Sequence, residues 1–264
     1  MKDIPKKIHY CWFGNNKIPD DQKKYIETWK KLCPDYEIKE WNEKNFDINC
    51  NKYVKEAYEA KKFAFVSDFV RLYALYNEGG IYMDTDVEVI KPLDSFLEQK
   101  AFVGFESEQD IMTGLIGAQK GNEWIKMLLE DYDEISFYQD NGEMDLTTNV
   151  ERIVNKTKQN YKINLKSSYQ ELGDVTIYPL DYFCAKDWKT GIVTKTKNTY
   201  TIHHFKGSWH TKEENMFIEL KRKLINKYDE KKAMKKYILY VRLYNLVRHP
   251  IRTCNNLIKK IIKK

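Results

Sequence analysis

The chain has 264 residues and a net charge of +6, with 42% hydrophobic and 14% aromatic residues, which is enough for one α/β domain and a small additional part. It contains no run of about 18 apolar residues, and its start, MKDIPKKIHY, lacks the apolar core of a signal peptide, so we expect neither a membrane-spanning helix nor a cleaved leader. Its five cysteines are an odd number without a CxxC pair, which favours free thiols in a reducing compartment over a disulfide framework or a zinc site.

The N-terminal part has a strand–helix–strand pattern. Lys6–Phe13 is rich in β-forming residues and ends at a Gly-Asn turn. A helix is expected from Asp20 or Asp21 to Leu32, and Tyr36–Trp41 is a second strand. This order predicts a βαβ unit and a parallel sheet. A short helix is expected over Lys52–Lys61.

The stretch Ala64–Pro92 is the most informative part of the chain. Apolar residues at three- and four-residue steps predict a helix that ends at Gly79 and Gly80. A short β-rich run then leads directly into Asp84 and Asp86. The two carboxylates are therefore expected at the mouth of a strand, where open α/β sheets bind their ligands.

Asp84 and Asp86 are two residues apart on extended chain, so their side chains share a face and repel each other unless a cation or proton lies between them. Mg²⁺ and Mn²⁺ prefer such oxygen ligands and often bridge them to phosphates. The alternative is a solvated acidic turn. Asp68 and Arg71 share one face of the preceding helix, either as an internal ion pair or as part of the same crevice.

The remaining body continues the alternation of strands and helices. The region 133–168 gives only a weak signal. The expected elements are strands at Val87–Ile90, Ala101–Glu106, Leu115–Ala118 and Val175–Leu180, and a helix over Glu123–Tyr132.

Histidines cluster near the end of the body, in the run Tyr200–His210. His203 and His204 point to opposite faces if this run is a strand, so at most one of them can face a metal held by the aspartates.

The charge distribution divides the chain. Residues 221–264 contain 15 Lys and Arg against two acids, a balance of +13, so residues 1–220 carry −7. We therefore expect a domain over 1–220 and a basic helical tail over 221–264. Ile and Lys pairs after Leu257 predict an amphipathic basic helix suited to a membrane surface, the alternative being an ordinary solvated helix.

The sequence SDFVRLYALYNEGGIYMDTDVEVIKPLD resembles the sugar-binding Asp-x-Asp region of retaining GT-A glycosyltransferases. The similar groups are bacterial capsular-polysaccharide transferases, yeast-type initiating α-1,6-mannosyltransferases and the glucosyltransferase domains of clostridial toxins. Their N-terminal motif is also present, as Ile4, Pro5, Lys7, Ile8, His9, Trp12, Gly14, Trp29, Pro34, Tyr36 and Trp41.

The resemblance implies a GT-A fold, which is Rossmann-like α/β with a mainly parallel mixed sheet, followed here by the basic helical tail. It also implies roles for the central residues. Asp68 and Arg71 would hold the donor sugar, Tyr82 the nucleotide, Asp84 the ribose and sugar, and Asp86 the metal. Asp68, Arg71, Asp84 and Asp86 are thus the expected catalytic set.

Four further residues receive roles from the same resemblance. Trp12 would stack on the nucleotide base, and Ser208 and Trp209 would contact the diphosphate, with core packing as the alternative for both tryptophans. His204, just before Lys206-Gly207, would complete the metal shell, as in the His-x-x-Gly segment of glycogenin-like enzymes.

The implied function is that of a hexosyltransferase that uses Mn²⁺ or Mg²⁺. It would move a hexose from a nucleotide sugar, with UDP favoured by Trp12, to a glycan or lipid-linked glycan in surface or capsular polysaccharide synthesis, with retention. We expect it in the cytoplasm, attached peripherally through the tail to the anionic inner face of the cell membrane, without a nucleic-acid partner.

Two alternatives compete with the transferase. One is a haloacid-dehalogenase-like phosphatase, because the hydrophobic run before Asp84-Thr85-Asp86-Val87 fits its motif. That motif ends the first strand of its domain, whereas about 80 residues with their own strand pattern come first here. The other is a non-catalytic membrane-binding protein, which leaves the charged residues around Asp84 unexplained.

Overall fold

The computed structural model describes residues 3–207 and 211–248. They form two compact units, an α/β body made of 3–187 and 193–207 and a helical unit made of 188–192 and 211–248. Residue 220, where the charge balance changes sign, lies within a helix of the second unit, and the division of the chain by charge stays a prediction.

Within the described residues, seven strands form one sheet in the order β2-β1-β3-β6-β5-β8-β7, and β4 pairs with β9 in a separate two-stranded sheet. Pairing is parallel for β1 with β2, β1 with β3 and β5 with β8, and antiparallel elsewhere. The α/β class and the mixed sheet are thus confirmed. The strands are β1 (Lys7–Cys11), β2 (Glu37–Trp41), β3 (Gly80–Met83), β4 (Val87–Val89), β5 (Ala101–Phe105), β6 (Ile111–Ala118), β7 (Gln170–Glu171), β8 (Thr176–Tyr178) and β9 (Thr201–His203).

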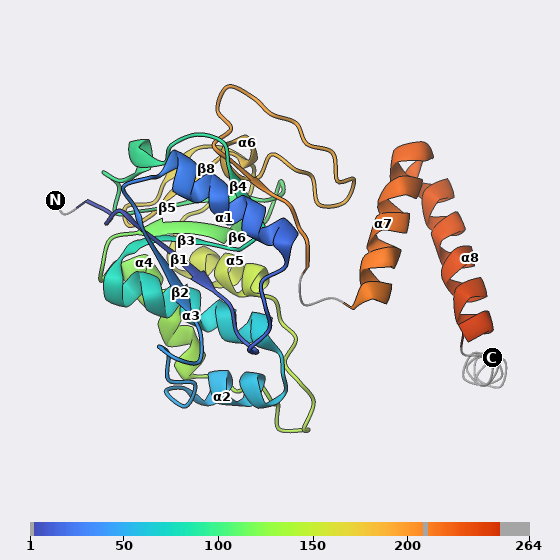
Figure 1. Ribbon diagram of the computed structural model, residues 1–264, viewed down its shortest axis with the longest axis horizontal. Helices are drawn as coiled ribbons and strands as arrows, with labels where there is room; N and C mark the ends of the chain where they lie inside the picture. The colour runs from blue at the N-terminus through green and yellow to red at the C-terminus, as the bar shows by residue number, and fades with distance from the viewer. Residues whose placement is uncertain (1–2, 208–210, 249–264) are drawn as a thin grey trace. The chain divides into compact units, whose positions relative to one another are not determined.

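Helices cover both faces of the large sheet, with α1 on one side and α2, α3 and α4 on the other (Figure 1). The helices are α1 (Asp20–Leu32), α2 (Lys52–Glu59), α3 (Phe63–Glu78), α4 (Glu123–Glu130), α5 (Asn149–Asn160), α6 (Leu180–Phe183), α7 (Lys212–Lys227) and α8 (Glu230–Arg248), with short 3₁₀ turns at Asp94–Phe96 and Asp131–Asp133.

The helix α3 and the strand β3 meet at the predicted glycine pair. Gly79 has φ of 68° and Gly80 has φ of 115°, which L-residues rarely adopt. A Cβ on Gly79 would lie 2.6 Å from the backbone nitrogen of Lys120, so no larger residue fits there without a shift of the backbone. The glycines therefore end the helix and let the chain turn at once into the central strand.

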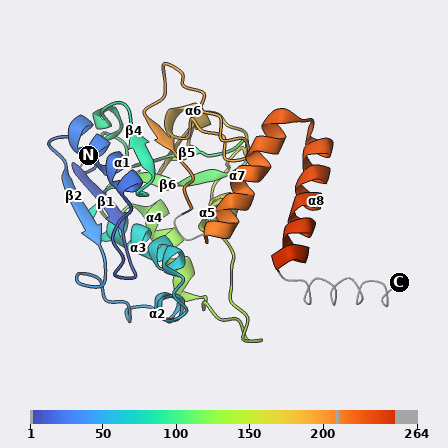
Figure 2. The ribbon, with the colours of Figure 1, turned by 45° about the vertical axis from the view of Figure 1, so that its right-hand side comes forward.

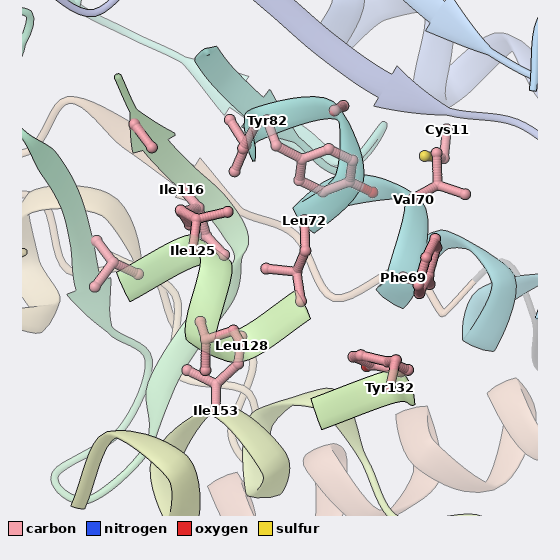
Figure 3. Packing of buried hydrophobic residues seen from close by; sticks show 14 of the residues in the cluster. Cys11, Phe69, Val70, Leu72, Tyr82, Ile116, Ile125, Leu128, Tyr132 and Ile153 are labelled. Carbon is pink, nitrogen blue, oxygen red and sulfur yellow. The ribbon is translucent and has the colours of Figure 1, made fainter. Parts of the chain in front are cut away.

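The core on the α3 side joins helices that are distant in sequence to the sheet. Its buried residues come from the strands of the sheet and from α2, α3, α4 and α5. Burial of this much apolar surface is the main force that holds these elements together. Figure 3 shows side chains from α3, α4, α5 and β6 meeting in this core, among them Leu72, Ile125, Leu128, Ile153 and Ile116.

On the other face, α1 holds β4 in place. The indole nitrogen of the buried Trp29 donates to the Val87 carbonyl at 2.7 Å, and the Val89 amide donates to the Thr28 hydroxyl at 3.0 Å. The segment that follows the two aspartates is therefore fixed to α1 as well as to β9.

Several elements differ from expectation. The short β7 and α6 were not expected, and α6 begins at Leu180, where a strand was expected to end. Strand β6 begins at Ile111 rather than Leu115, and helix α5 forms in the region where the sequence signal was weak. Thr148 caps α5 by accepting from the Glu151 amide, and Trp124 of α4 donates to Thr157 at 3.0 Å. Tertiary contacts thus stabilise a helix with few apolar residues.

The second unit contains a hairpin of α7 and α8, which lie side by side (Figure 2). Thr211 and Glu214 form a capping box at the start of α7, and Phe217 packs edge-on against Tyr237 and Tyr244 of α8. Several apolar residues of α8 remain exposed, including Leu239 and Leu243. The amphipathic segment predicted after Leu257 lies outside the described residues.

Candidate active site

Asp84 lies directly after β3, between its neighbours β1 and β6 in the large sheet. Its backbone amide donates to the Gly114 carbonyl at 2.8 Å, and its Oδ1 accepts from the Tyr82 hydroxyl at 2.8 Å. Both contacts arise from the sheet itself. The sheet therefore fixes the orientation of this carboxylate before any ligand binds.

Arg71 connects the helix to the strand end. Its Nη2 lies 2.7 Å from Asp68 Oδ1 and 3.7 Å from Asp84 Oδ1, and its Nη1 donates to the Thr113 carbonyl at 2.7 Å. The guanidinium also lies over the Tyr82 ring, 4.7 Å from its centroid. Asp68 and Arg71 thus form an internal ion pair that also borders Asp84, and we call this pair the wall of the site.

Burial shapes the electrostatics of this wall. Burial raises the pKa of Asp68 to about 6, although nearby Arg71 acts in the opposite direction. For Arg71, burial opposes the charged form, but Tyr82, Asp84 and Asp68 together raise its pKa, so it stays a cation. The wall thus contains a guanidinium that stays charged and lies between the carboxyl groups of Asp68 and Asp84.

Asp86 faces a different set of partners. Its Oδ1 lies 3.3 Å from His203 Nε2, and its Oδ2 accepts from the Lys206 backbone amide at 2.7 Å. The same His203 nitrogen is 4.0 Å from Asp84 Oδ2. The imidazole therefore bridges the two carboxylates of the Asp-x-Asp turn.

Asp86 and His203 stabilise each other's charge. Burial alone would raise the pKa of Asp86, but His203 and the Lys206 amide hold it at about 2. Burial alone would lower the pKa of His203, but Asp86 and Cys184 raise it well above its usual value. The Nδ1 atom of His203 is buried without a hydrogen-bond partner among the described residues.

The structure places His203, and not His204, beside the aspartates, which corrects our choice of the third ligand. His203 pairs with Val87 in the β4–β9 sheet and points inward. His204 Nε2 instead lies 2.8 Å from Glu88 Oε2, and its ring stacks on Tyr25 with a centroid distance of 4.4 Å. Alternation along the strand separates the two rings, as expected, but the register selects the other histidine.

Asp84, Asp86 and His203 could hold a metal ion, because one ligand atom from each lies within 4.8 Å of the others. Two carboxylates and an imidazole are common ligands of divalent cations in proteins. The donor chemistry of these residues thus fits a divalent ion, and Asp84 links it to the wall formed by Asp68 and Arg71.

The roles of the other site residues stay predictions, and the structure shows where two of them lie. Trp12 is partly exposed just after β1, and its indole nitrogen donates to the Asn16 carbonyl at 2.6 Å. Tyr82 is buried, with only its hydroxyl in contact with Asp84. Ser208 and Trp209 lie outside the described residues.

Gly114 is a site residue that the sequence analysis missed. A Cβ at this position of β6 would lie 3.0 Å from Asp84 Oδ2 and 3.0 Å from His203 Cε1. The site therefore needs the space that a glycine leaves. A glycine inside a β-rich run often marks a close approach of other groups, and that signal was available in the sequence.

Comparisons with known proteins find similarity to glycosyltransferases. Residues 19–103 match the family described as glycosyltransferase sugar-binding region containing DXD motif. Inositol phosphoceramide mannosyltransferase 3 of Schizosaccharomyces pombe is 29% identical over 145 residues, covering 51% of this chain and 38% of that protein. The initiation-specific α-1,6-mannosyltransferase of Candida albicans is 28% identical over 112 residues, covering 39% of this chain and 29% of that protein.

Among solved structures, the PaToxG glycosyltransferase superposes with a TM-score of 0.44 at 17% identity, over 60% of this chain and 69% of that one. The chain spans well under half the length of the two mannosyltransferases, so similarity to them is limited to a shared segment. The match to the family, residues 19–103, includes α3, the turn with Asp84 and Asp86, and β4.

Proposed function

We propose that this chain, whose residues 19–103 match the sugar-binding region of glycosyltransferases with a DXD motif, is a metal-dependent hexosyltransferase that uses a nucleotide-sugar donor. One observation is decisive for this proposal: Asp84, Asp86 and His203 meet at the carboxyl end of β3, directly beside Arg71. A divalent cation and a fixed guanidinium suit a diphosphate and the sugar attached to it.

Each residue has a distinct task in this proposal. A bound Mn²⁺ or Mg²⁺ neutralises charge on the departing nucleoside diphosphate. Asp84 Oδ2, Asp86 and His203 would hold it, and the imidazole ligand favours Mn²⁺. Asp68 and the Thr113 carbonyl orient Arg71, which would bind the donor through guanidinium N–H groups that these two contacts do not use. Retention of configuration rests on the family resemblance alone.

The donor is proposed to be a UDP-hexose. Trp12 is partly exposed at the carboxyl end of β1, which lies next to β3, so its indole is available to stack on a base. The matched relatives are named as mannosyltransferases, which makes GDP-mannose the competing donor. The acceptor is proposed to be a glycan or lipid-linked glycan in surface polysaccharide synthesis.

We further infer peripheral attachment to the anionic cytoplasmic face of the cell membrane. The support is the basic balance of residues 221–264 and the exposed Leu239 and Leu243 on α8. Each Lys or Arg near such a surface contributes about 1 kcal/mol. None of the helices in the described part combines the length and the apolar character that crossing a bilayer requires.

Vesicle co-sedimentation tests this attachment. The protein should pellet with phosphatidylglycerol vesicles at low salt and less as salt rises, and hardly at all with phosphatidylcholine. The double substitution Leu239→Ser and Leu243→Ser should weaken pelleting without affecting donor hydrolysis. Equal pelleting with both lipids would contradict an electrostatic attachment.

Donor hydrolysis tests the enzymatic proposal. The purified protein should hydrolyse one of UDP-glucose, UDP-galactose or GDP-mannose when Mn²⁺ is present, and EDTA should stop the reaction. Hydrolysis of p-nitrophenyl phosphate, and of none of the nucleotide sugars, would favour the phosphatase alternative. Against that alternative, Asp84 follows the third strand of the chain and not the first. A protein that turns over none of these compounds but binds vesicles would favour the non-catalytic alternative.

A further inference from the structure

The hairpin of β5 and β6 brings a further acidic residue, Glu106, to the edge of the sheet where Asp84 lies. Strand β6 is antiparallel to both β3 and β5, so β3 and β5 run in the same direction. Asp84 follows β3 and Glu106 follows β5, which places both residues after the carboxyl ends of parallel strands. Only β6, with Thr113 and Gly114, separates them.

The side of the sheet that Glu106 faces follows from its neighbours. Phe105 belongs to the core on the α3 side, so the next residue along the strand direction points to the opposite side. The backbone of Glu106 agrees, because its carbonyl lies 4.0 Å from the thiol of Cys184, which belongs to the opposite core. Cys184 is also one of the groups that raise the pKa of His203. Glu106 is thus on the His203 side of the site.

The carboxyl of Glu106 differs from the other acids of its loop. Asp110 accepts a hydrogen bond from the Ser107 hydroxyl at 2.6 Å, and Glu108 is exposed. Glu106 is partly buried, and its carboxyl has no hydrogen bond or ion pair within the described ranges 3–207 and 211–248. Burial raises its pKa to about 7, with His203 opposing this shift and Asp110 and Asp84 adding to it. The carboxyl oxygens of Glu106 are not fully buried, so they are open to a ligand. A carboxyl with a raised pKa beside such a site is a candidate functional group.

The ligand of Glu106 is not the metal, because Glu106 is not among the three residues whose ligand atoms lie within 4.8 Å of one another. The proposed donor brings a different group to this crevice. If the cation holds the diphosphate and Arg71 lies on one side of the hexose, the hexose hydroxyls extend toward the opposite wall. The carboxyl oxygens of a glutamate accept hydrogen bonds in the ionised form and keep acceptor capacity when protonated, and hydroxyl groups are suitable donors to them.

On this basis we propose that Glu106 is a substrate-binding residue that accepts a hydrogen bond from one hydroxyl group of the transferred hexose and so selects the donor sugar. The inference rests on the proposed transferase function. Sites that bond a substrate hydroxyl discriminate strongly against analogues that lack it, because the protein group is then left unpaired. Glu106 therefore explains how the enzyme would distinguish hexoses that differ at a single hydroxyl.

The test compares full and deoxy donors in the hydrolysis assay with Mn²⁺. For the wild type, one of the four donors deoxygenated at C2, C3, C4 or C6 should lower kcat/KM by about 10- to 100-fold, the range for a hydrogen bond to a charged group. Glu106→Gln should show a similar loss with the full donor and no further loss with that one analogue, as a double-mutant cycle requires for a direct contact. Glu108→Gln, two residues away and exposed, is the matched control and should behave as the wild type.

The outcomes distinguish failure of the proposed transferase function from failure of the role assigned to Glu106. If the wild type hydrolyses no nucleotide sugar, the proposed function fails and this inference fails with it. If the wild type is active but Glu106→Gln matches it with every donor, the inference alone is overturned. An equal loss with all donors, or a loss seen only in transfer to an added glycan, also overturns it, since it indicates a general or an acceptor-side role. Thermal melting of Glu106→Gln and of Glu106→Ala verifies that both variants are folded.

Discussion

The two aspartates of the Asp84-Thr85-Asp86 turn lie two residues apart, yet their surroundings come from different parts of the chain. The nearest side-chain partners of Asp84 are Tyr82 and Arg71, both within 13 residues of it, whereas His203 is 4.0 Å away. The Asp84 side chain is 27% exposed. Asp86 is 12% exposed and depends on His203 and Lys206, which lie more than 100 residues further on. The half around Asp84 therefore depends mainly on side chains close in sequence, and the half around Asp86 depends on long-range contacts.

This difference implies a division of labour. The local half has a fixed guanidinium and a more accessible carboxylate, which suit a polar substrate. The long-range half is more enclosed and combines a carboxylate with an imidazole, which suits a cation. The following predictions test whether the two halves can be separated by substitution.

The largest effect is expected for Asp86→Ala. Loss of a ligand to a cation that stabilises a departing diphosphate should lower kcat/KM by about 10³-fold or more, equivalent to about 4 kcal/mol. Asp84→Ala should be nearly as inactive, since Asp84 contributes to both halves. Mn²⁺-dependent donor hydrolysis measures this effect, and circular dichroism monitors folding. Near-wild-type turnover of either variant would refute the metal assignment.

The two histidines distinguish the metal half from its surroundings. His203→Ala should weaken Mn²⁺ binding by about 100-fold, because it removes one of three protein ligands. His204→Ala should leave Mn²⁺ binding near the wild-type value, since its ring contacts Glu88 and Tyr25. Electron paramagnetic resonance of free Mn²⁺ gives both affinities directly. The reverse ranking would restore His204 as the ligand.

Gly114→Ala should disturb both halves at once. The added methyl group would be 3.0 Å from both Asp84 Oδ2 and His203 Cε1, and overpacking of this kind costs about 1–3 kcal/mol. We expect Mn²⁺ affinity to fall by about 10- to 30-fold. Gly121→Ala is the control, because no atom lies within 4 Å of a Cβ there. It should lower the melting temperature through its φ of +73° and leave Mn²⁺ affinity intact.

The smallest effect is expected for Trp12→Ala, which lies outside both halves. Base stacking contributes about 1–3 kcal/mol, so the donor KM should rise about tenfold while kcat changes little. Steady-state kinetics with the productive donor gives both constants. If the variant is instead unfolded by circular dichroism, Trp12 is a packing residue.

Most of the body could be predicted from sequence because its elements have strong periodicity and clear ends. Strand β3 and helix α3 meet at Gly79 as expected. Helix α5 was missed because its buried face has few apolar residues and its stability comes from contacts such as that between Trp124 and Thr157. The first half of β6 was missed because Gly114 has a low strand preference and separates Ile111–Thr113 from the apolar residues that follow.

The site shows a similar limit. Asp84 and its neighbours could be predicted because sequence spacing alone brings them together. The choice between His203 and His204 depended on the register of β9 against β4, and a slip of one residue exchanges the two rings. No local pattern fixes such a register. Glu106 was not singled out because strand order, rather than spacing, brings it to this edge.

The pairing of β4 with β9 also has a consequence for how the protein is made. Val87 and His203 can meet only after the intervening chain has been synthesised, and closing so long a loop is entropically unfavourable until the sheet and α1 have positioned β4. A nascent chain that has emerged only as far as β8 would contain Asp84 and Asp86 but not their third partner. During synthesis, affinity for the cation should therefore appear late and abruptly, when β9, the last strand of the α/β body, pairs with β4.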